Sequence, residues 1–176
     1  MNRLARNILI AAVALAAAGA GYLVSHLRQV FPSDPAGARE LLALTLPDAQ
    51  GTNQSMQQWQ GKLLVVNFWA TWCPPCREEM PGFSRLQHRF SAKNVQFVGI
   101  GIDSADKIRQ FSHDFPVGYP LLVGGTALMG LTDQLGDHEG GLPFTVVLGR
   151  DGKLLQTQLG LWPESDLEKV LVGLAK

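Results

Sequence analysis

Two apolar runs in the middle of the chain flank a segment with a helical pattern. Residues 63–70 (LLVVNFWA) and 94–103 (NVQFVGIGID) are rich in Val, Ile and aromatic side chains. Runs of this kind are typical of strands buried on both faces, in the centre of a sheet. Between them, residues 74–90 place apolar side chains at three- and four-residue spacing, which predicts an amphipathic helix. Pro81 lies inside this helix and is expected to kink it.

The remaining pattern predicts further strands and helices on either side of these elements. A short strand and a turn are expected in 41–51, and Asp151-Gly152 predicts a hairpin turn within 141–160. Ser104 is expected to cap a helix whose inner face carries Ile108, Phe111 and Phe115. The other expected elements are an extended piece at 119–123, a helix over 126–136 ended by Gly136, and a closing helix over 163–176. This order of elements predicts an α/β fold with a mixed central sheet and helices on both faces.

The N-terminal segment differs from the rest of the chain. Residues 8–27 contain no Asp, Glu, Lys or Arg, and Arg3 and Arg6 precede them. A cleaved signal peptide and an uncleaved membrane helix both fit this pattern, and the apolar residues at 22–24 favour the helix. Under both interpretations the rest of the chain is exported across the membrane. The two arginines are expected to keep the N-terminus in the cytoplasm. We therefore expect a signal anchor and linker over 1–40, and a folded domain over 41–176.

Composition excludes some classes of protein. Fifteen basic residues balance fifteen acidic ones, so the chain lacks the basic excess of a nucleic-acid-binding protein. Hydrophobic residues make up 46% of the chain and charged residues 17%, which is enough apolar material for a packed core.

The two cysteines, Cys73 and Cys76, stand in the sequence WCPPC and are the only ones in the chain. A disulfide across two intervening residues closes too short a loop to act as a structural staple. A zinc site needs four ligands, and the four histidines lack the spacing of a finger or ribbon. Redox chemistry is the remaining interpretation.

The predicted position of the cysteines, between a buried strand and a helix start, supports redox chemistry. The free amide hydrogens and the dipole at a helix N-terminus stabilise a thiolate, so the pKa of Cys73 is expected to fall. Pro74 and Pro75 fit the first helical turn. Cys73 is predicted to be the exposed attacking residue, and Cys76, one turn further inward, to resolve the mixed disulfide.

The sequence NFWATWCPPCREEMP resembles the thioredoxin fold and, within it, the membrane-anchored TlpA/ResA-like thiol-disulfide oxidoreductases of bacteria. The similarity extends from about Leu41 to the C-terminus and includes GLPFTVVLGRDGKLL. The resemblance implies a cis peptide bond between Leu142 and Pro143, which would bring the Leu142 backbone beside Cys73 to pair with an extended substrate. Substrate-binding residues are then expected to be Trp72, Pro74, Leu142 and Pro143.

One position departs from thioredoxins proper, which carry a buried acid six residues ahead of the first cysteine. Here that residue is Asn67, which cannot take a proton. ResA-like proteins instead resemble this chain in carrying an acid three residues after the second cysteine, which here is Glu79. We expect Glu79 to relay a proton or to tune the pKa of the pair. The alternative is that Glu78 and Glu79 are acids favoured only by the helix dipole.

The resemblance implies a protein-disulfide reductase on the outer side of the cytoplasmic membrane. Implied partners are exported proteins with disulfides, including apocytochrome c, and a membrane electron donor of the DsbD/CcdA type. No bound cofactor or metal is expected, because the two sulfurs are the redox centre. Three alternatives stay open: a disulfide-donating oxidant, a copper- or haem-handling thiol chaperone, and a peroxidase of the same fold.

Overall fold

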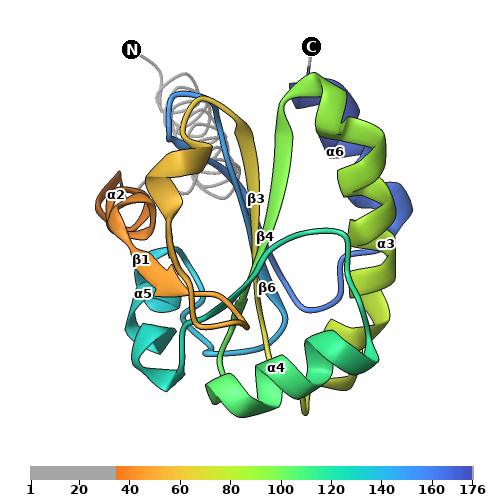
Figure 1. The fold of residues 1–176 in the computed structure, drawn as a ribbon. Helices are drawn as coiled ribbons and strands as arrows, with labels where there is room; N and C mark the ends of the chain where they lie inside the picture. Colours follow the sequence, from red (N-terminus) through yellow and green to blue (C-terminus); the bar gives the residue numbers. More distant parts are fainter. Residues whose placement is uncertain (1–34, 176) are drawn as a thin grey trace, which may run out of the picture. The chain divides into compact units, whose positions relative to one another are not determined.

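A five-stranded mixed sheet forms the centre of the fold (Figure 1). The computed structural model describes residues 35–175 of the chain. The strand order across the sheet is β5-β4-β3-β6-β7. The strands are β3 (Leu63–Trp69), β4 (Val95–Gly101), β5 (Leu121–Val123), β6 (Phe144–Leu148) and β7 (Leu154–Leu159).

The central strand, β3, fixes the layout of the sheet. All its residues are buried, as the unbroken apolar run predicts. It pairs in parallel with β4 and antiparallel with β6, so the predicted mixed sheet is confirmed. The register sets Asn67 between Gly99 on β4 and Thr145 on β6. Polar and small residues therefore lie side by side across the three middle strands of the sheet.

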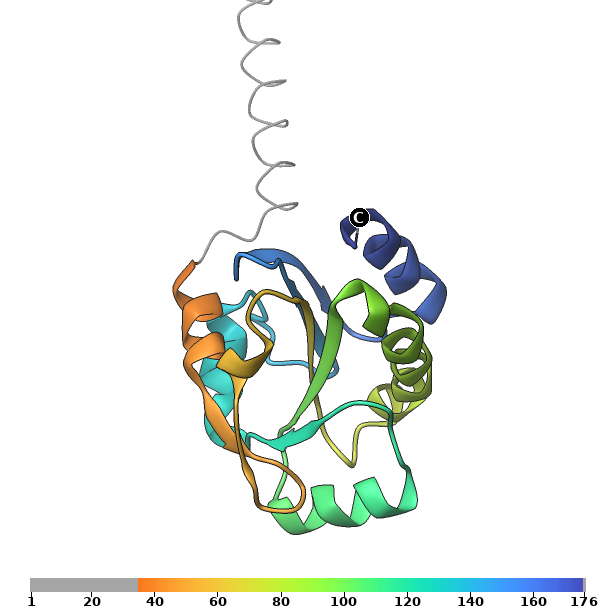
Figure 2. The same ribbon diagram turned by 45° about the horizontal axis from the view of Figure 1, so that its top comes forward.

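Helices cover both faces of the sheet, as predicted (Figures 1 and 2). Two separate hydrophobic clusters fill the space between the sheet and these helices. One cluster includes residues of α3 (Pro74–Phe90) and α6 (Glu164–Leu174), and the other includes residues of α2 (Pro35–Ala43) and α5 (Met129–Gln134). The fifth helix of the described region, α4 (Ala105–Asp114), buries Ile108 and Phe111 in the α3 cluster.

Shorter elements complete the described part of the chain. The strand predicted in 41–51 is β1 (Thr45–Pro47), which pairs antiparallel with β2 (Asn53–Ser55). The sequence pattern did not predict β2, because its residues are polar. Three 3₁₀ helices connect larger elements: η1 (Met56–Trp59), η2 (Ser91–Lys93) and η3 (Thr126–Leu128).

Several details of the fold differ from the sequence predictions, and the helix expected over 126–136 is split into η3 and the shorter α5. The helix α2 begins at Pro35, ahead of the expected boundary at Leu41, and buries Ala38 and Leu41. Phe115 was expected inside but is half exposed, because α4 ends at Asp114 and Phe115 lies just beyond it. Ser104 occupies the N-cap position of α4, but its side chain makes no capping hydrogen bond.

The predicted signal anchor, which was drawn from residues 8–27, lies outside the described residues. Between residues 35 and 175, no helix combines the length and the apolar character needed to cross a membrane.

Candidate active site

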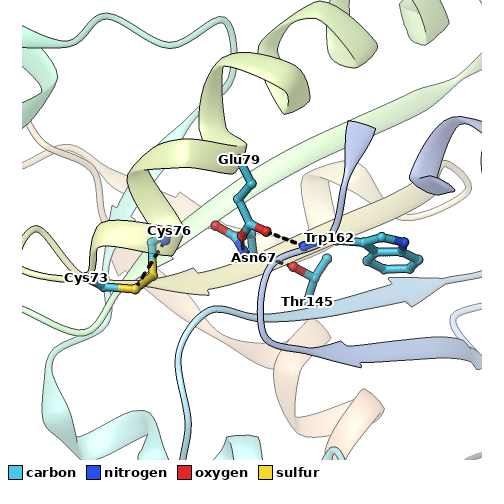
Figure 3. The surroundings of a disulfide bond; sticks show 6 residues. All are labelled: Asn67, Cys73, Cys76, Glu79, Thr145 and Trp162. Atoms are coloured by element: carbon cyan, nitrogen blue, oxygen red, sulfur yellow. Dashed lines mark hydrogen bonds between the residues drawn. A yellow bond between two sulfur atoms is a disulfide. The ribbon is translucent and has the colours of Figure 1, made fainter. Parts of the chain in front are cut away.

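The redox pair lies where β3 gives way to α3. The Cys73–Cys76 disulfide joins the residue before α3 to its first turn, with the Cα atoms 5.3 Å apart (Figure 3). Cys73 is the N-cap of α3, and its Sγ accepts a hydrogen bond of 3.3 Å from the Cys76 N–H. The strand-to-helix position predicted for the motif is therefore confirmed.

The exposure of the two cysteines differs from the prediction. Cys76 is fully buried, as expected, but Cys73 is also buried, with only 3% of its surface exposed. Its neighbour Trp72, by contrast, is 64% exposed, and Pro74 is exposed as well. In the disulfide form, the flanking side chains rather than Cys73 itself make up the accessible surface around the motif.

The two prolines limit how strongly the helix can stabilise a thiolate on Cys73. Pro74 and Pro75 occupy the first two positions of α3 and have no N–H. The Cys76 N–H is therefore the first helical donor that can reach Cys73 Sγ. The electrostatic help that a helix start usually gives is reduced at this site.

The loop before β6 carries the predicted cis peptide bond between Leu142 and Pro143. Pro143 is buried, and Leu142 is partly buried against both hydrophobic clusters. Leu142 and Trp72 line the same surface cavity of about 660 Å³. Most other residues around this cavity are apolar or small, among them Ile102, Gly125 and Met129.

Glu79 is buried beneath the redox motif, one helical turn after Cys76. It is 5% exposed, whereas its neighbour Glu78 is exposed. Its Oε2 accepts a hydrogen bond of 2.9 Å from the Trp162 N–H, and its Oε1 accepts one of 2.8 Å from Asn67 Nδ2. Burial raises the pKa of Glu79 to about 7, although both hydrogen bonds favour the carboxylate. A group with this pKa can gain and lose a proton near neutral pH.

Asn67 and Trp162 bring distant parts of the chain to Glu79. Asn67 Nδ2 donates a second hydrogen bond of 2.9 Å to Thr145 Oγ1 on β6 (Figure 3). The sequence singled out Asn67 as a departure from thioredoxin, but no sequence signal pointed to the Trp162 contact. Trp162 contacts Glu79 through its backbone N–H, which almost every residue type has, so the identity of the residue gives no indication of this contact.

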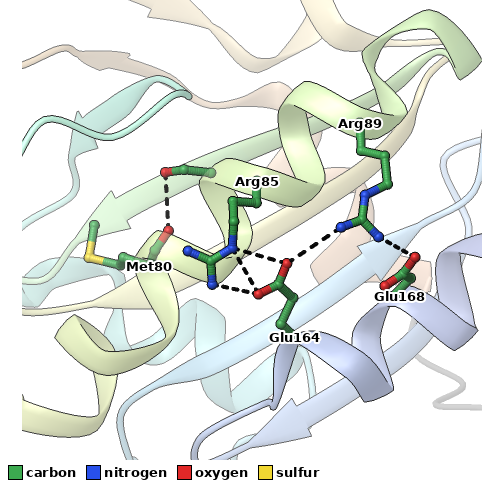
Figure 4. Close-up of polar contacts among 6 residues, drawn as sticks. Met80, Arg85, Arg89, Glu164 and Glu168 are labelled. Carbon is green, nitrogen blue, oxygen red and sulfur yellow. Dashed lines mark hydrogen bonds and ion pairs between the residues drawn. The ribbon is translucent and has the colours of Figure 1, made fainter.

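Ion pairs join α3 to the beginning of α6, which starts two residues after Trp162. Glu164, the first residue of α6, receives two hydrogen bonds from Arg85 Nε, of 3.2 and 3.0 Å, and one of 2.5 Å from Arg85 Nη2 (Figure 4). One turn along α3, Arg89 pairs with Glu168 and approaches Glu164 at 3.9 Å. These contacts hold the start of α6 on α3, just after the Trp162 N–H that reaches Glu79.

A second acid, Asp103, supports the redox loop from the end of β4. Its Oδ2 accepts a 2.6 Å hydrogen bond from Thr71 Oγ1, two residues before Cys73. Burial alone would raise the pKa of Asp103, but hydrogen bonds from Thr71 and Ser104 together with Lys107 hold it below its usual value. Sequence reasoning missed this contact, although Thr71 and Asp103 each lie two residues beyond the end of one of two neighbouring parallel strands, β3 and β4.

A Cys-X-X-Cys pair at the start of the helix that follows a central strand is the working site of proteins that exchange disulfides on a thioredoxin fold. The fold and the site thus define a thiol-disulfide oxidoreductase, as predicted. Residues 35–171 match the model of the Redoxin family, and the chain belongs to that family.

Similar proteins are named as thioredoxin-like proteins and thiol-disulfide oxidoreductases. The chain is 27% identical over 158 residues to the thioredoxin-like protein YneN of Bacillus subtilis, covering 86% of this chain and 89% of that protein. It is 26% identical over 135 residues to the thiol-disulfide oxidoreductase ResA of Bacillus cereus, covering 76% of this chain and 75% of that protein. The predicted resemblance to ResA-like proteins is confirmed.

Solved structures confirm the fold. A thiol:disulfide interchange protein of the thioredoxin family from Chlorobium tepidum superposes with a TM-score of 0.67 at 24% identity, covering 76% of this chain and 93% of that one. A secreted disulfide oxidoreductase of Mycobacterium tuberculosis, described as homologous to DsbE, gives a TM-score of 0.65 at 22% identity, covering 77% and 98%.

Proposed function

We propose that this oxidoreductase works as a reductant of disulfides in exported proteins. The observation that carries the proposal is the pair of prolines at the first two positions of α3, which leaves the Cys76 N–H as the donor to Cys73 Sγ. Oxidising members of the fold owe their potential to a strongly stabilised thiolate in the reduced form. Here Pro74 and Pro75 remove two amide donors, and the buried carboxyl of Glu79 adds negative charge whenever it ionises. Both features favour the disulfide form and make the dithiol a good electron donor.

The proposed reaction transfers two electrons to the substrate. The Cys73 thiolate attacks one sulfur of the substrate disulfide, forms a mixed disulfide and releases the first substrate thiolate, which takes a proton from water. Cys76 then loses its proton, attacks Cys73 Sγ and releases the second substrate thiolate. The products are the Cys73–Cys76 disulfide and two substrate thiols, so a dithiol donor must reduce the pair again.

Glu79 is proposed as the group that takes the Cys76 proton in the resolving step. It lies on the same helix, one turn away, and a pKa of about 7 makes it a base near neutral pH. The alternative, that Glu79 is only a first-turn acid attracted by the helix dipole, fits Glu78 better, because Glu78 is exposed and Glu79 is buried.

The substrate is proposed to bind across Trp72, Pro74, Leu142 and Pro143. The apolar cavity between Trp72 and Leu142 favours a polypeptide with a bulky apolar side chain close to its cysteine.

Replacing Trp72 with alanine is expected to raise KM for such a disulfide peptide by roughly tenfold, because an exposed aromatic contact is lost, with a smaller change in kcat. Steady-state kinetics with a disulfide peptide measures both constants. Phe115→Ala, which removes another exposed aromatic side chain outside this cavity, is the matched control and should leave KM unchanged. Equal effects of the two substitutions would contradict the proposed binding surface.

The proposed location is the outer face of the cytoplasmic membrane, with a single N-terminal anchor. The uncharged residues 8–27 behind Arg3 and Arg6 support it. The resemblance to ResA-like proteins supports apocytochrome c among the substrates and a membrane donor of the DsbD/CcdA type as the source of electrons.

The midpoint reduction potential tests the direction of electron flow. The full chain in detergent micelles is equilibrated with glutathione and dithiothreitol buffers, and the oxidised fraction of the cysteine pair is measured by alkylation and mass spectrometry. We expect a potential more negative than a glutathione poise of about −220 to −260 mV. A value near that of strong oxidants, about −120 mV, would make the chain a disulfide donor instead.

A further inference from the structure

The amide of Asn67 connects Glu79 to the sheet, and its hydrogen bonds are only partly satisfied. Both hydrogens of Nδ2 are used, one by Glu79 Oε1 and one by Thr145 Oγ1. The other end of the amide, Oδ1, is buried without a hydrogen-bond partner. A buried acceptor without a donor costs free energy, so this arrangement calls for a compensating role.

The observed orientation of the amide suits an ionised Glu79. A carboxylate only accepts hydrogen bonds, and here each of its oxygens faces a donor: the Trp162 N–H at Oε2 and Asn67 Nδ2 at Oε1.

A protonated Glu79 does not suit that orientation. The Trp162 N–H can only donate, so Oε2 must remain an acceptor and the proton belongs on Oε1. That proton then points at Nδ2 of Asn67, which is also a donor, and the two groups repel. Turning the amide by half a rotation replaces Nδ2 with Oδ1, which accepts the new hydrogen. Thr145 tolerates both orientations, because its hydroxyl accepts from Nδ2 in one and donates to Oδ1 in the other.

We propose that Asn67 is a positioning residue whose side-chain amide turns over each time Glu79 gains or loses a proton. This inference rests on the proposed function, because that function has Glu79 exchange a proton during catalysis. Asn67 cannot carry the proton, but this movement lets one buried site stabilise both protonation states of Glu79. In the turned orientation Oδ1 gains donors, while Nδ2 takes the position in which Oδ1 had no hydrogen-bond partner. One end of the amide is therefore unpaired in either orientation, and the protonation state of Glu79 decides which end it is.

Few other ionisable groups face Glu79 in the described structure. Cys76, one turn before it in α3, is held in the disulfide with Cys73. The segment before β5 contributes the Tyr119 hydroxyl, whose pKa is raised by burial and then by the Glu79 charge. On α6, the charges of Glu164 and Glu168 are engaged at the surface by Arg85 and Arg89. The Glu79 proton is therefore the event to which the amide responds.

Nuclear magnetic resonance of the labelled full chain in its disulfide form tests the proposal, because the cysteines do not titrate in that form. The Glu79 Cδ shift reports its protonation, and nuclear Overhauser contacts from the Asn67 Nδ2 hydrogens to Thr145 report the amide orientation. We expect these contacts above the Glu79 midpoint and their loss below it. Contacts that stay the same across the midpoint, or a Glu79 that does not titrate, would overturn the proposal.

Two variants of neighbouring residues serve as controls. Glu79→Gln presents a donor and an acceptor at every pH, so the Asn67 contacts should become independent of pH. Glu78→Gln, at the exposed neighbour, should leave the switch intact. If the contacts still change with pH in Glu79→Gln, another group drives them and the assignment to Glu79 is wrong.

A third variant separates positioning from simple packing. Asn67→Leu keeps the branching of the side chain but offers neither a donor to the carboxylate nor an acceptor to the protonated acid. Because the hydrogen bond to the charged form is the stronger of the two, the proton affinity of Glu79 should rise only about threefold. A rise well beyond tenfold, as expected if Asn67 stabilised the carboxylate alone, would contradict the proposal. These readouts do not depend on the direction of electron flow. An oxidising midpoint potential would reject the proposed reductase but would not contradict the amide movement. An amide that keeps one orientation across the Glu79 midpoint would reject the movement but would not contradict the reductase.

Discussion

A Cys73→Ser variant is expected to lose all disulfide reductase activity, and a Cys76→Ser variant to stop at the mixed disulfide with its substrate. Cys73 caps α3 and adjoins the exposed Trp72, whereas Cys76 is fully buried one turn inside. Once the pair is reduced, Cys73, beside the exposed Trp72, is expected to attack the incoming disulfide, and Cys76 to release the substrate from the mixed disulfide. Incubation with a disulfide peptide, followed by mass spectrometry without reductant, measures the adduct.

The double variant with both serines controls for non-specific trapping and should form no adduct. The burial of Cys73 in the disulfide form adds a further expectation, because reduction must let the Cys73 sulfur meet a substrate. Adduct formation by Cys73→Ser but not by Cys76→Ser would mean that Cys76 attacks first and Cys73 resolves.

The sequence predicts the central elements of the fold because their signals are local. The apolar run of β3 and the spacing of α3 each identify one element without reference to the rest of the chain. The two cysteines then occupy the junction between these elements, so the redox site follows from the order of a strand and a helix. The cis bond at Pro143 came from the resemblance to a family and is present.

The surroundings of Glu79 could not be predicted because they depend on contacts across long stretches of chain. Asn67 meets Thr145 only through the register of β3 with β6, and Trp162 reaches Glu79 through its backbone N–H. Neither contact is visible in residue type or spacing. The same limit explains why Phe115 is exposed although its spacing predicted a buried side chain. The helix α4 ends at Asp114, and the spacing of apolar residues does not show where a helix ends.

A Glu79→Gln variant is expected to be more stable than the wild type above pH 7 and to match it at acidic pH. Because the folded-state pKa of Glu79, about 7, exceeds the ordinary value of 4.5, the protonated carboxyl favours the folded protein. That stabilisation is complete below about pH 4.5 and is lost as the pH rises through about 7. The pKa difference corresponds to about 3 kcal/mol in the free energy of unfolding.

Urea unfolding of the disulfide form over a pH series measures this difference. Glutamine stays neutral, so its curve should diverge from the wild type between about pH 4.5 and 7 and then run parallel to it. Glu78→Gln is the matched control, because that side chain is exposed, and its curve should follow the wild type throughout. Parallel curves for Glu79→Gln and wild type over the whole pH range would mean that Glu79 is not held in a strongly perturbed site.

The same variant separates structural burial from a role in proton transfer. If Glu79 takes the Cys76 proton, its replacement by glutamine must also change how cysteine alkylation of the reduced protein depends on pH. If Glu79→Gln changes the stability curve but leaves the alkylation profile identical to that of the wild type, Glu79 is a buried carboxyl that destabilises the protein at alkaline pH and takes no part in proton transfer from the cysteines. A buried charge with that cost and no catalytic benefit would have no evident reason to lie one turn from Cys76, so we expect the two measurements to change together.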